Sequence, residues 1–238
     1  MDMHFGPGPG ERGIDWPRAE AALDAEGFAL LPALLEPCEC AALVSLYDQD
    51  RFRSRVIMSR HGFGSGEYKY FRHPLPEPVG ELRARLYAKL APIANRWTAS
   101  MGIEADFPPA HEAYLARCHE AGQVRPTPLL LRYGPGDHNC LHQDLYGDHV
   151  FPLQVAILLA EPGEDFLGGE FVLTEQRPRR QSRVAVAPLR KGDGIVFAVN
   201  RRPVRGARGV YRATMRHGVS ALRSGERHTL GILFHDAA

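Results

Sequence analysis

The sequence contains little cysteine, little net charge and no long apolar stretch. Its four cysteines, Cys38, Cys40, Cys118 and Cys140, follow neither a disulfide nor a zinc-site spacing, so we expect reduced thiols. No apolar run approaches the roughly 18 residues that a membrane-spanning helix needs. Residues 1–13 are rich in glycine and proline and lack the apolar segment of a secretory signal, so we expect a disordered tail. These absences argue against a disulfide-stapled scaffold and a membrane-spanning protein, and they favour a cytoplasmic one.

The net charge of +1 hides an uneven distribution of charge. Residues 177–228 contain 14 lysines and arginines, but their only acidic residues are Asp193 and Glu226. Such a split predicts a basic face that binds a polyanion. The alternative is that the arginines are scattered over solvated strand edges, where charge prevents aggregation. The two interpretations differ in whether the basic residues converge near a functional site.

The first half of the chain, residues 14–126, is expected to be mainly helical support. Apolar residues recur there at helical spacing, as Leu82, Leu86 and Leu90 do, and Asp15 stands where a helix cap is expected. The predicted elements are helices over 17–26, 37–49, 80–101 and 109–121, with a strand over 28–31.

Residues 51–73 mix arginines with aromatic residues around several glycines. A flexible, glycine-rich segment of this composition could close over a substrate, stack on bases and contact phosphates. In the alternative interpretation, the segment is an ordinary loop and hairpin whose aromatic side chains fill the core. The first interpretation makes Tyr68 and Tyr70 candidate substrate contacts.

From Thr127 onward the pattern changes to short apolar strands separated by glycine-rich turns. Regular short strands with such turns indicate a sandwich or barrel of the jelly-roll type. We therefore predict an α+β fold in which residues 127–238 form a jelly-roll catalytic core, integrated with residues 14–126 into one domain. The expected strands cover 129–133, 140–144, 151–159, 170–174, 184–189, 194–199, 214–222 and 227–234.

The segment His142-Gln143-Asp144 carries the residues most suggestive of chemistry. On a strand, side chains two positions apart point to the same face, so His142 and Asp144 can approach one metal ion. His217, on a later predicted strand, completes a set of two imidazoles and one carboxylate. Such a triad leaves coordination positions open and is the ligand set of non-haem Fe(II) oxygenases. The histidines that compete for this role are His138, His149, His228 and His235.

A dicarboxylate that chelates iron at one end needs a partner at its other end. Arg227, on the last predicted strand, offers a fork-shaped guanidinium that suits bidentate capture of a carboxylate. Thr229 lies two residues further on the same face and can hydrogen-bond the same carboxylate. Tyr133, on the strand before the His142 strand, could supply a hydroxyl.

Several motifs follow one another along residues 127–236, and their order resembles the prolyl 4-hydroxylase-type branch of the Fe(II)/2-oxoglutarate oxygenase superfamily. The resemblance implies a double-stranded β-helix with Fe(II), 2-oxoglutarate and O2 as cofactors. It implies that His142, Asp144 and His217 bind iron. It also implies that Tyr133, Arg227 and Thr229 bind 2-oxoglutarate. The motifs are Arg132-Tyr133-Gly134-Pro135-Gly136, His142-x-Asp144, Gly168-Gly169-Glu170-Phe171, Lys191-Gly192-Asp193 with Phe197, and His217-Gly-Val with Gly225-Glu-Arg227-His-Thr229.

The whole chain also resembles a bacterial group of these oxygenases that is classed as acting on damaged nucleic acid, by analogy with AlkB-type demethylases. The clustered arginines of residues 200–216 lead to the same substrate class, because this segment is expected to be a loop that runs into His217, brings positive charge near the iron ligands and binds phosphates. A substrate base would then be unstacked into the pocket. The arginines of this loop are Arg201, Arg202, Arg205, Arg208, Arg212 and Arg216.

The leading hypothesis is therefore oxidative demethylation of alkylated, single-stranded nucleic acid, as in DNA repair. Hydroxylation of a prolyl or other peptide residue is the alternative within the oxygenase class. A cupin-like metal protein without oxygenase activity is the alternative outside it.

Overall fold

Two antiparallel sheets form the centre of the computed structural model, which describes residues 13–207 and 209–238. The predicted disordered tail therefore lies, up to residue 12, outside the described residues. The larger sheet runs in the order β1 (Phe28–Leu31), β11 (Gly194–Ala198), β7 (Leu153–Leu158), β15 (Arg227–Ile232), β5 (Leu129–Tyr133), β4 (Glu67–Phe71) and β2 (Phe52–Ile57).

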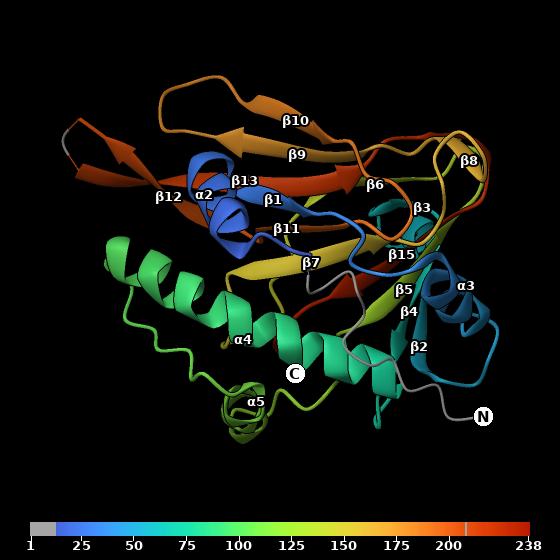
Figure 1. Cartoon of the computed structure of the whole chain (residues 1–238), viewed down its shortest axis with the longest axis horizontal. Helices are drawn as coiled ribbons and strands as arrows, with labels where there is room; N and C mark the ends of the chain where they lie inside the picture. The colour runs from blue at the N-terminus through green and yellow to red at the C-terminus, as the bar shows by residue number, and fades with distance from the viewer. Residues whose placement is uncertain (1–12, 208) are drawn as a thin grey trace.

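The smaller sheet faces the larger one across the barrel (Figure 1). Its order is β10 (Arg183–Ala187), β9 (Phe171–Gln176), β13 (Gly209–Val219), β6 (His138–His142) and β3 (Gly64–Ser65), and β12 (Arg201–Gly206) pairs with β13. A short ribbon of β8 (Phe166–Gly168) and β14 (Leu222–Gly225) closes one end. The predicted double-stranded β-helix of the α+β class is confirmed.

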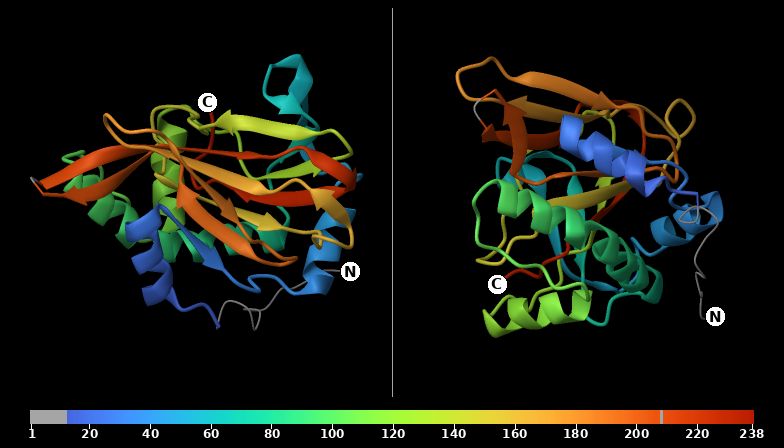
Figure 2. Two further views of the ribbon diagram at one scale, coloured as in Figure 1. Left: turned by 90° about the horizontal axis from the view of Figure 1, so that it is seen from above. Right: turned by 60° about the vertical axis from the view of Figure 1, so that its left-hand side comes forward.

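Helices cover the outer face of the larger sheet, and this explains why its central strands are apolar throughout. Every residue of β7, β11 and β15 is buried, as expected for strands covered on both faces. The long helix α4 (Glu77–Ser100) lies across that face with its buried stripe of Leu82, Leu86 and Leu90 (Figure 1). Figure 2 shows α5 (His111–Glu120) on the far side of α4, away from the sheets.

The predicted N-terminal elements are confirmed, with small shifts of their bounds. Helix α2 (Trp16–Glu26) begins at Asp15, whose carboxylate accepts a hydrogen bond from the Arg18 amide at 3.0 Å. It ends at Gly27, whose positive φ of 81° suits glycine. Helix α3 (Pro37–Ser45) is shorter than expected.

Residues 51–73 form the hairpin of the second interpretation. Strand β4 pairs with both β2 and β5, so the hairpin extends the larger sheet. A 3-10 turn, η1 (Met58–Arg60), and β3 lie between the hairpin strands. Phe71 is fully buried, whereas Phe63 is 47% exposed. The aromatic residues of this segment are therefore divided between the core and the surface.

The prediction of a loop over 200–216 is wrong, because β12 and β13 pair as a hairpin that projects from one end of the barrel (Figure 1). Along β12 the side chains alternate between exposed Arg201 and Arg205 and buried Arg202 and Val204. Because the buried Arg202 is charged, the polarity of the sequence does not show this alternation of buried and exposed positions. Arg208, which the loop prediction included, lies outside the described residues.

All four cysteines are free thiols, as predicted; Cys40 and Cys118 are buried, and Cys38 and Cys140 are exposed. Among the described residues, no helix has the length and apolar character needed to cross a membrane.

Candidate active site

His142, Asp144 and His217 converge inside the barrel, on the smaller sheet. His142 lies directly opposite His217 in the pairing of β6 with β13. The Nε2 atoms of the two histidines lie 3.5 Å from separate oxygens of Asp144. Ligands about 2.0–2.2 Å from one ion stand roughly 3–3.5 Å apart, so this spacing fits a shared metal. The sequence placed all three residues together, although Asp144 follows β6 rather than lying within it.

The backbone at this point allows the two histidine strands to approach closely. A Cβ on Gly218 would stand 2.6 Å from the Asn139 carbonyl oxygen, so the residue after His217 has room only for glycine. The register of β13 against β6 shifts between His217 and Val219. The shift ends regular pairing beside the two imidazoles and leaves the segment after His142 free to turn Asp144 toward them.

The electrostatic surroundings of Asp144 and His217 suit a divalent metal. Burial alone would raise the pKa of Asp144, but its hydrogen bond with His217 and the charges of both histidines hold that pKa well below its usual range. Burial lowers the pKa of His217. The His142 Nδ1–H donates to the Cys140 carbonyl oxygen at 2.8 Å, which directs Nε2 toward the cluster. The set therefore offers an anionic oxygen and lone pairs on imidazole nitrogen, as metal ligation requires.

Two further residues, which the sequence did not single out, hold this cluster in place. The Tyr146 hydroxyl donates to Asp144 Oδ1 at 2.9 Å. The Gln143 amide donates to Asn200 Oδ1 and to the Met215 carbonyl oxygen, both at 2.8 Å. Gln143 directly precedes Asp144 and Tyr146 follows it by two residues, and only the turn after β6 reveals their different roles.

Arg227 faces the cluster from the larger sheet. It is opposite Tyr133 in the pairing of β15 with β5, and its Nη1 donates to Thr229 Oγ1 at 2.6 Å. Arg227, Tyr133 and Thr229 are each 5% exposed or less. Burial lowers the pKa of Arg227 to about 10, so the guanidinium stays charged at neutral pH. The co-substrate residues predicted from the sequence thus lie together.

Within the described residues, the Arg227 guanidinium has no carboxylate partner, and its buried Nε has no hydrogen-bond acceptor. The other two fully buried arginines are paired. Arg83 donates to Asp236 Oδ1 at 2.8 Å, and Arg202 donates to Glu175 Oε2 at 2.6 Å. Because an unpaired buried charge is costly, the arrangement around Arg227 fits an anionic ligand such as the distal carboxylate of 2-oxoglutarate.

A cavity of about 200 Å³ joins the histidine cluster to Arg227 and Thr229. Tyr68 and Tyr70, the predicted substrate contacts, line it with their rings 5.3 Å apart in an edge-to-face arrangement. Tyr146 meets Tyr70 at 90° and continues this wall toward Asp144. Phe63 stands at the exposed end of the lining. The lining of the cavity therefore combines aromatic side chains with the charged groups.

The arginines of residues 200–216 that the structure describes do not line this cavity. Arg201 and Arg205 are exposed on β12, and Arg216 is exposed because it alternates with His217 across the sheet. Arg202 is buried against Glu175 and the carbonyl oxygens of Asp24 and Ala25, so its guanidinium is unavailable to a substrate. The expectation that the segment brings positive charge to the metal cluster is corrected on these grounds.

The competing histidines lie outside the cluster. His228 and His235 are buried, and His228 packs edge-on against Tyr47. His149 is exposed. His138 lies on β6, but its Nδ1 faces the Gly136 carbonyl oxygen at 3.5 Å.

The fold occurs in solved oxygenase structures. A prolyl-4-hydroxylase from Pseudomonas putida superposes with a TM-score of 0.54 at 14% identity, covering 94% of this chain and 99% of that one. A 2OG-Fe(II) oxygenase family oxidoreductase from Burkholderia pseudomallei gives a TM-score of 0.54 at 19% identity, covering 100% of this chain and 98% of that one. At these identities the likeness concerns the fold.

Sequence comparisons identify the family of the chain. The uncharacterized protein Rv2227 of Mycobacterium tuberculosis is 52% identical over 168 residues, which is 71% of this chain and 72% of that protein. Residues 66–237 match the model of the Oxygenase-NA family, described as an oxygenase catalysing oxidative methylation of damaged DNA. Together with the barrel and the His–Asp–His cluster, this match implies Fe(II), 2-oxoglutarate and O2 as cofactors. The match covers the aromatic wall, the histidine cluster and Arg227 alike, and the chain is therefore an oxygenase that belongs to the Oxygenase-NA family.

Proposed function

We propose that this oxygenase oxidatively demethylates alkylated bases in single-stranded nucleic acid. The observation that carries the proposal is the aromatic wall beside the histidine cluster, formed by Tyr68, Tyr70 and Tyr146. Flat bases stack on aromatic side chains, and an enzyme that acts on a base must hold it outside the helical stack. The family description, which names damaged DNA, supports the same substrate class.

In this proposal, His142, Asp144 and His217 hold Fe(II), and Arg227 with Thr229 holds the distal carboxylate of 2-oxoglutarate. Tyr133 contributes its buried hydroxyl to the same pocket. Together with its co-substrates, the iron supplies the oxidant that inserts one oxygen atom into a C–H bond, as 2-oxoglutarate becomes succinate and CO2. The low pKa of Asp144 keeps its carboxylate charged for ligation across the neutral range.

The chain's own contribution is to orient the base and to exclude water. Tyr68 and Tyr70 present ring faces and edges to the cavity, and Arg53 lies 4.5 Å from the centroid of the Tyr70 ring, which fixes that ring from the other side. A methyl group on a ring nitrogen would then point toward the histidine cluster. Insertion of oxygen gives an N-hydroxymethyl group, whose C–N bond breaks to release formaldehyde and return the proton to the base nitrogen.

The test measures succinate and formaldehyde together, with Fe(II), 2-oxoglutarate and a methylated single-stranded oligonucleotide. We expect the two products in equal amounts, and none with the His142→Ala variant. Tyr70→Ala should reduce the rate with the oligonucleotide about tenfold, since loss of one stacking partner costs roughly 1–3 kcal/mol. Tyr70→Phe, which keeps the ring, is the matched control and should retain most of the rate.

A proline-rich peptide is the comparison substrate, because the fold likeness includes prolyl hydroxylases. Turnover with the peptide and not with methylated nucleic acid would replace this proposal with peptidyl hydroxylation. Equal turnover with methylated and unmethylated oligonucleotides, without formaldehyde, would also contradict it.

A further inference from the structure

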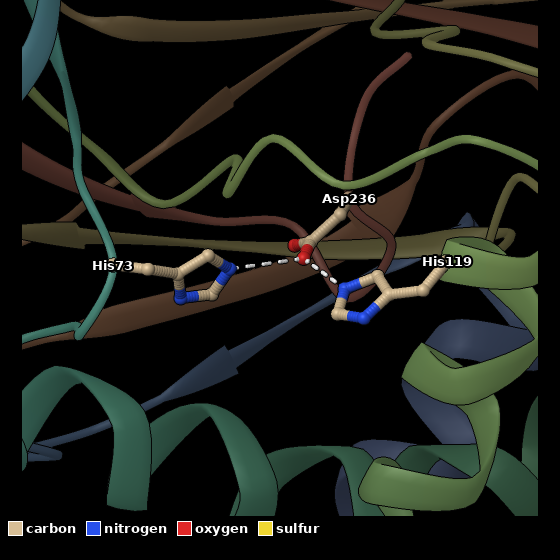
Figure 3. A group of neighbouring side chains, drawn as sticks. All are labelled: His73, His119 and Asp236. Atoms are coloured by element: carbon tan, nitrogen blue, oxygen red, sulfur yellow. Dashed lines mark hydrogen bonds and ion pairs between the residues drawn. The ribbon is translucent and has the colours of Figure 1, made fainter.

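A second group of two histidines and one aspartate lies outside the active site. His73 follows β4, His119 lies on α5, and Asp236 belongs to the C-terminal segment (Figure 3). Their donor atoms all lie within 4.8 Å of one another. Figure 3 shows the two imidazole rings approaching the Asp236 carboxylate from opposite sides. We propose that His73, His119 and Asp236 form a second divalent-metal site, of the kind that binds Zn²⁺.

The donor geometry supports a metal ion at this place. The Nε2 atom of His119 lies 3.0 Å from Asp236 Oδ2, and that of His73 lies 3.4 Å from the same oxygen. Ligands on a tetrahedral zinc ion, about 2.0–2.2 Å from the metal, stand roughly 3.3–3.5 Å apart, so small adjustments bring all three to one ion. Two imidazole nitrogens and one carboxylate oxygen are a donor set that suits zinc.

The aspartate is held in a form that can ligate. Its side chain is fully buried, and its other oxygen, Oδ1, accepts from Arg83 Nη2 at 2.8 Å. Arg83 thus fixes the carboxylate from behind, as outer partners of metal ligands do, and leaves Oδ2 to the histidines.

The histidines keep the site accessible. Their side chains are 46% and 42% exposed, so an ion can enter from solution and the remaining coordination positions can hold water. The fully buried arginine beside this group, Arg83, is paired with Asp236, in contrast to Arg227 in the active site, and a 2-oxoglutarate-dependent reaction is not expected here. The site instead joins three segments that are distant in the sequence.

Such an ion would stabilise the C-terminal segment against the rest of the chain. The Asp236 carbonyl oxygen accepts from the Gln123 amide at 2.6 Å, and the same amide donates to the Tyr146 carbonyl oxygen at 3.1 Å. The ion would therefore help to hold in place the C-terminal segment, which Gln123 connects to the turn that carries Tyr146.

The experiment counts Zn²⁺ bound to metal-stripped protein by titration calorimetry. Wild-type protein should bind two equivalents with micromolar or tighter affinity. The His73→Ala/His119→Ala variant should bind one, and so should His142→Ala/His217→Ala. The remaining equivalent in each variant shows that the chain is folded. His61→Ala is the matched control. It removes an exposed histidine that belongs to neither cluster, and it should bind two equivalents of Zn²⁺.

Thermal unfolding gives a second readout that does not depend on activity. In the His142→Ala/His217→Ala background, saturating Zn²⁺ should raise the unfolding midpoint by several degrees, because the ion binds only the folded chain. Adding His119→Ala to that background should abolish the shift. A single equivalent bound by wild-type protein, or two equivalents retained by His73→Ala/His119→Ala, would overturn the proposal.

Discussion

The two clusters of two histidines and one aspartate share a donor set but differ in the arginine beside them. In the cluster around Asp236, the buried Arg83 forms an ion pair with the aspartate itself, with 2.8 Å between Arg83 Nη2 and Asp236 Oδ1. In the cluster around Asp144, the buried Arg227 has only Thr229 as a hydrogen-bond partner among the described residues. The first arginine completes a structural ion pair, whereas the second is suited to an anionic ligand. We therefore infer that the surroundings of the two ligand sets, more than their donor atoms, distinguish the roles that we propose for them.

Burial separates the clusters in the same sense. Asp144 and His217 are buried and line a cavity with aromatic walls, while His73 and His119 are almost half exposed. A water-poor cavity strengthens electrostatic interactions with a bound substrate. A half-exposed site offers no such environment and is suited to tying segments together.

The largest effect is expected from removing one ligand of each cluster in turn. Asp144→Ala should lower turnover of 2-oxoglutarate more than about a thousandfold, because metal chemistry contributes several kcal/mol to the transition state. His119→Ala should change turnover less than about threefold. Succinate formation under saturating Fe(II) measures both variants. A large loss of turnover with His119→Ala, in a chain that still binds one metal equivalent, would mean that the clusters act together.

The second effect concerns stability and falls on the paired arginine. Arg83→Met leaves the Asp236 carboxylate buried without its cation, which should lower the free energy of unfolding by about 3 to 5 kcal/mol. Chemical denaturation of metal-free protein measures the change. The double variant Arg83→Met/Asp236→Leu removes both charges and should recover much of the loss. If the double variant were as unstable as the single one, packing rather than charge would explain the result.

The third effect concerns the unpaired arginine and should appear in binding. Arg227→Met should raise the KM for 2-oxoglutarate roughly thirtyfold, since a hydrogen bond to a charged group contributes about 2 kcal/mol. Its free energy of unfolding in the absence of co-substrate should change little or increase, because the variant no longer buries an unpaired charge. Titration with 2-oxoglutarate measures the KM, and chemical denaturation measures the free energy of unfolding. The stability of Arg227→Met should therefore change in a different direction from that of Arg83→Met. An unchanged KM would show that the co-substrate binds elsewhere.

The sequence predicted one cluster and not the other, for a physical reason. His142 and Asp144 are two residues apart on one segment, and His217 and Arg227 follow on strands whose two-residue period fixes the direction of their side chains. His73, His119 and Asp236 come from a loop, a helix and the C-terminal segment. No local periodicity relates three such elements, so only the packed fold brings them together.

A buried ion pair explains the principal error in the strand prediction. The run of arginines over β12 predicts a basic loop, whereas in the structure Arg202 occupies a core-facing position of a strand. In the fold, Glu175 of β9, which flanks β13 on its other side in the same sheet, neutralises that arginine. A charged residue is compatible with a core-facing strand position only when it has a partner of opposite charge. Glu175 is 27 residues away from Arg202, so the sequence does not reveal that the two residues pair. The jelly-roll arrangement itself was predictable because most of the other strands have apolar residues at regular intervals.

The smallest effect should come from the exposed arginines of the β12–β13 hairpin. Arg201→Gln/Arg205→Gln removes charges that face solvent away from the cavity, so turnover with a short methylated oligonucleotide should change less than about threefold. Arg53→Gln is the contrasting variant, because Arg53 lies 4.5 Å from the centroid of the Tyr70 ring, and it should lower the rate more. Oligonucleotides of increasing length would sharpen the comparison. A loss that grows with length for the hairpin variant alone would mean that the hairpin binds phosphates beyond the cavity, whereas a large loss with the shortest substrate would place the hairpin at the active site.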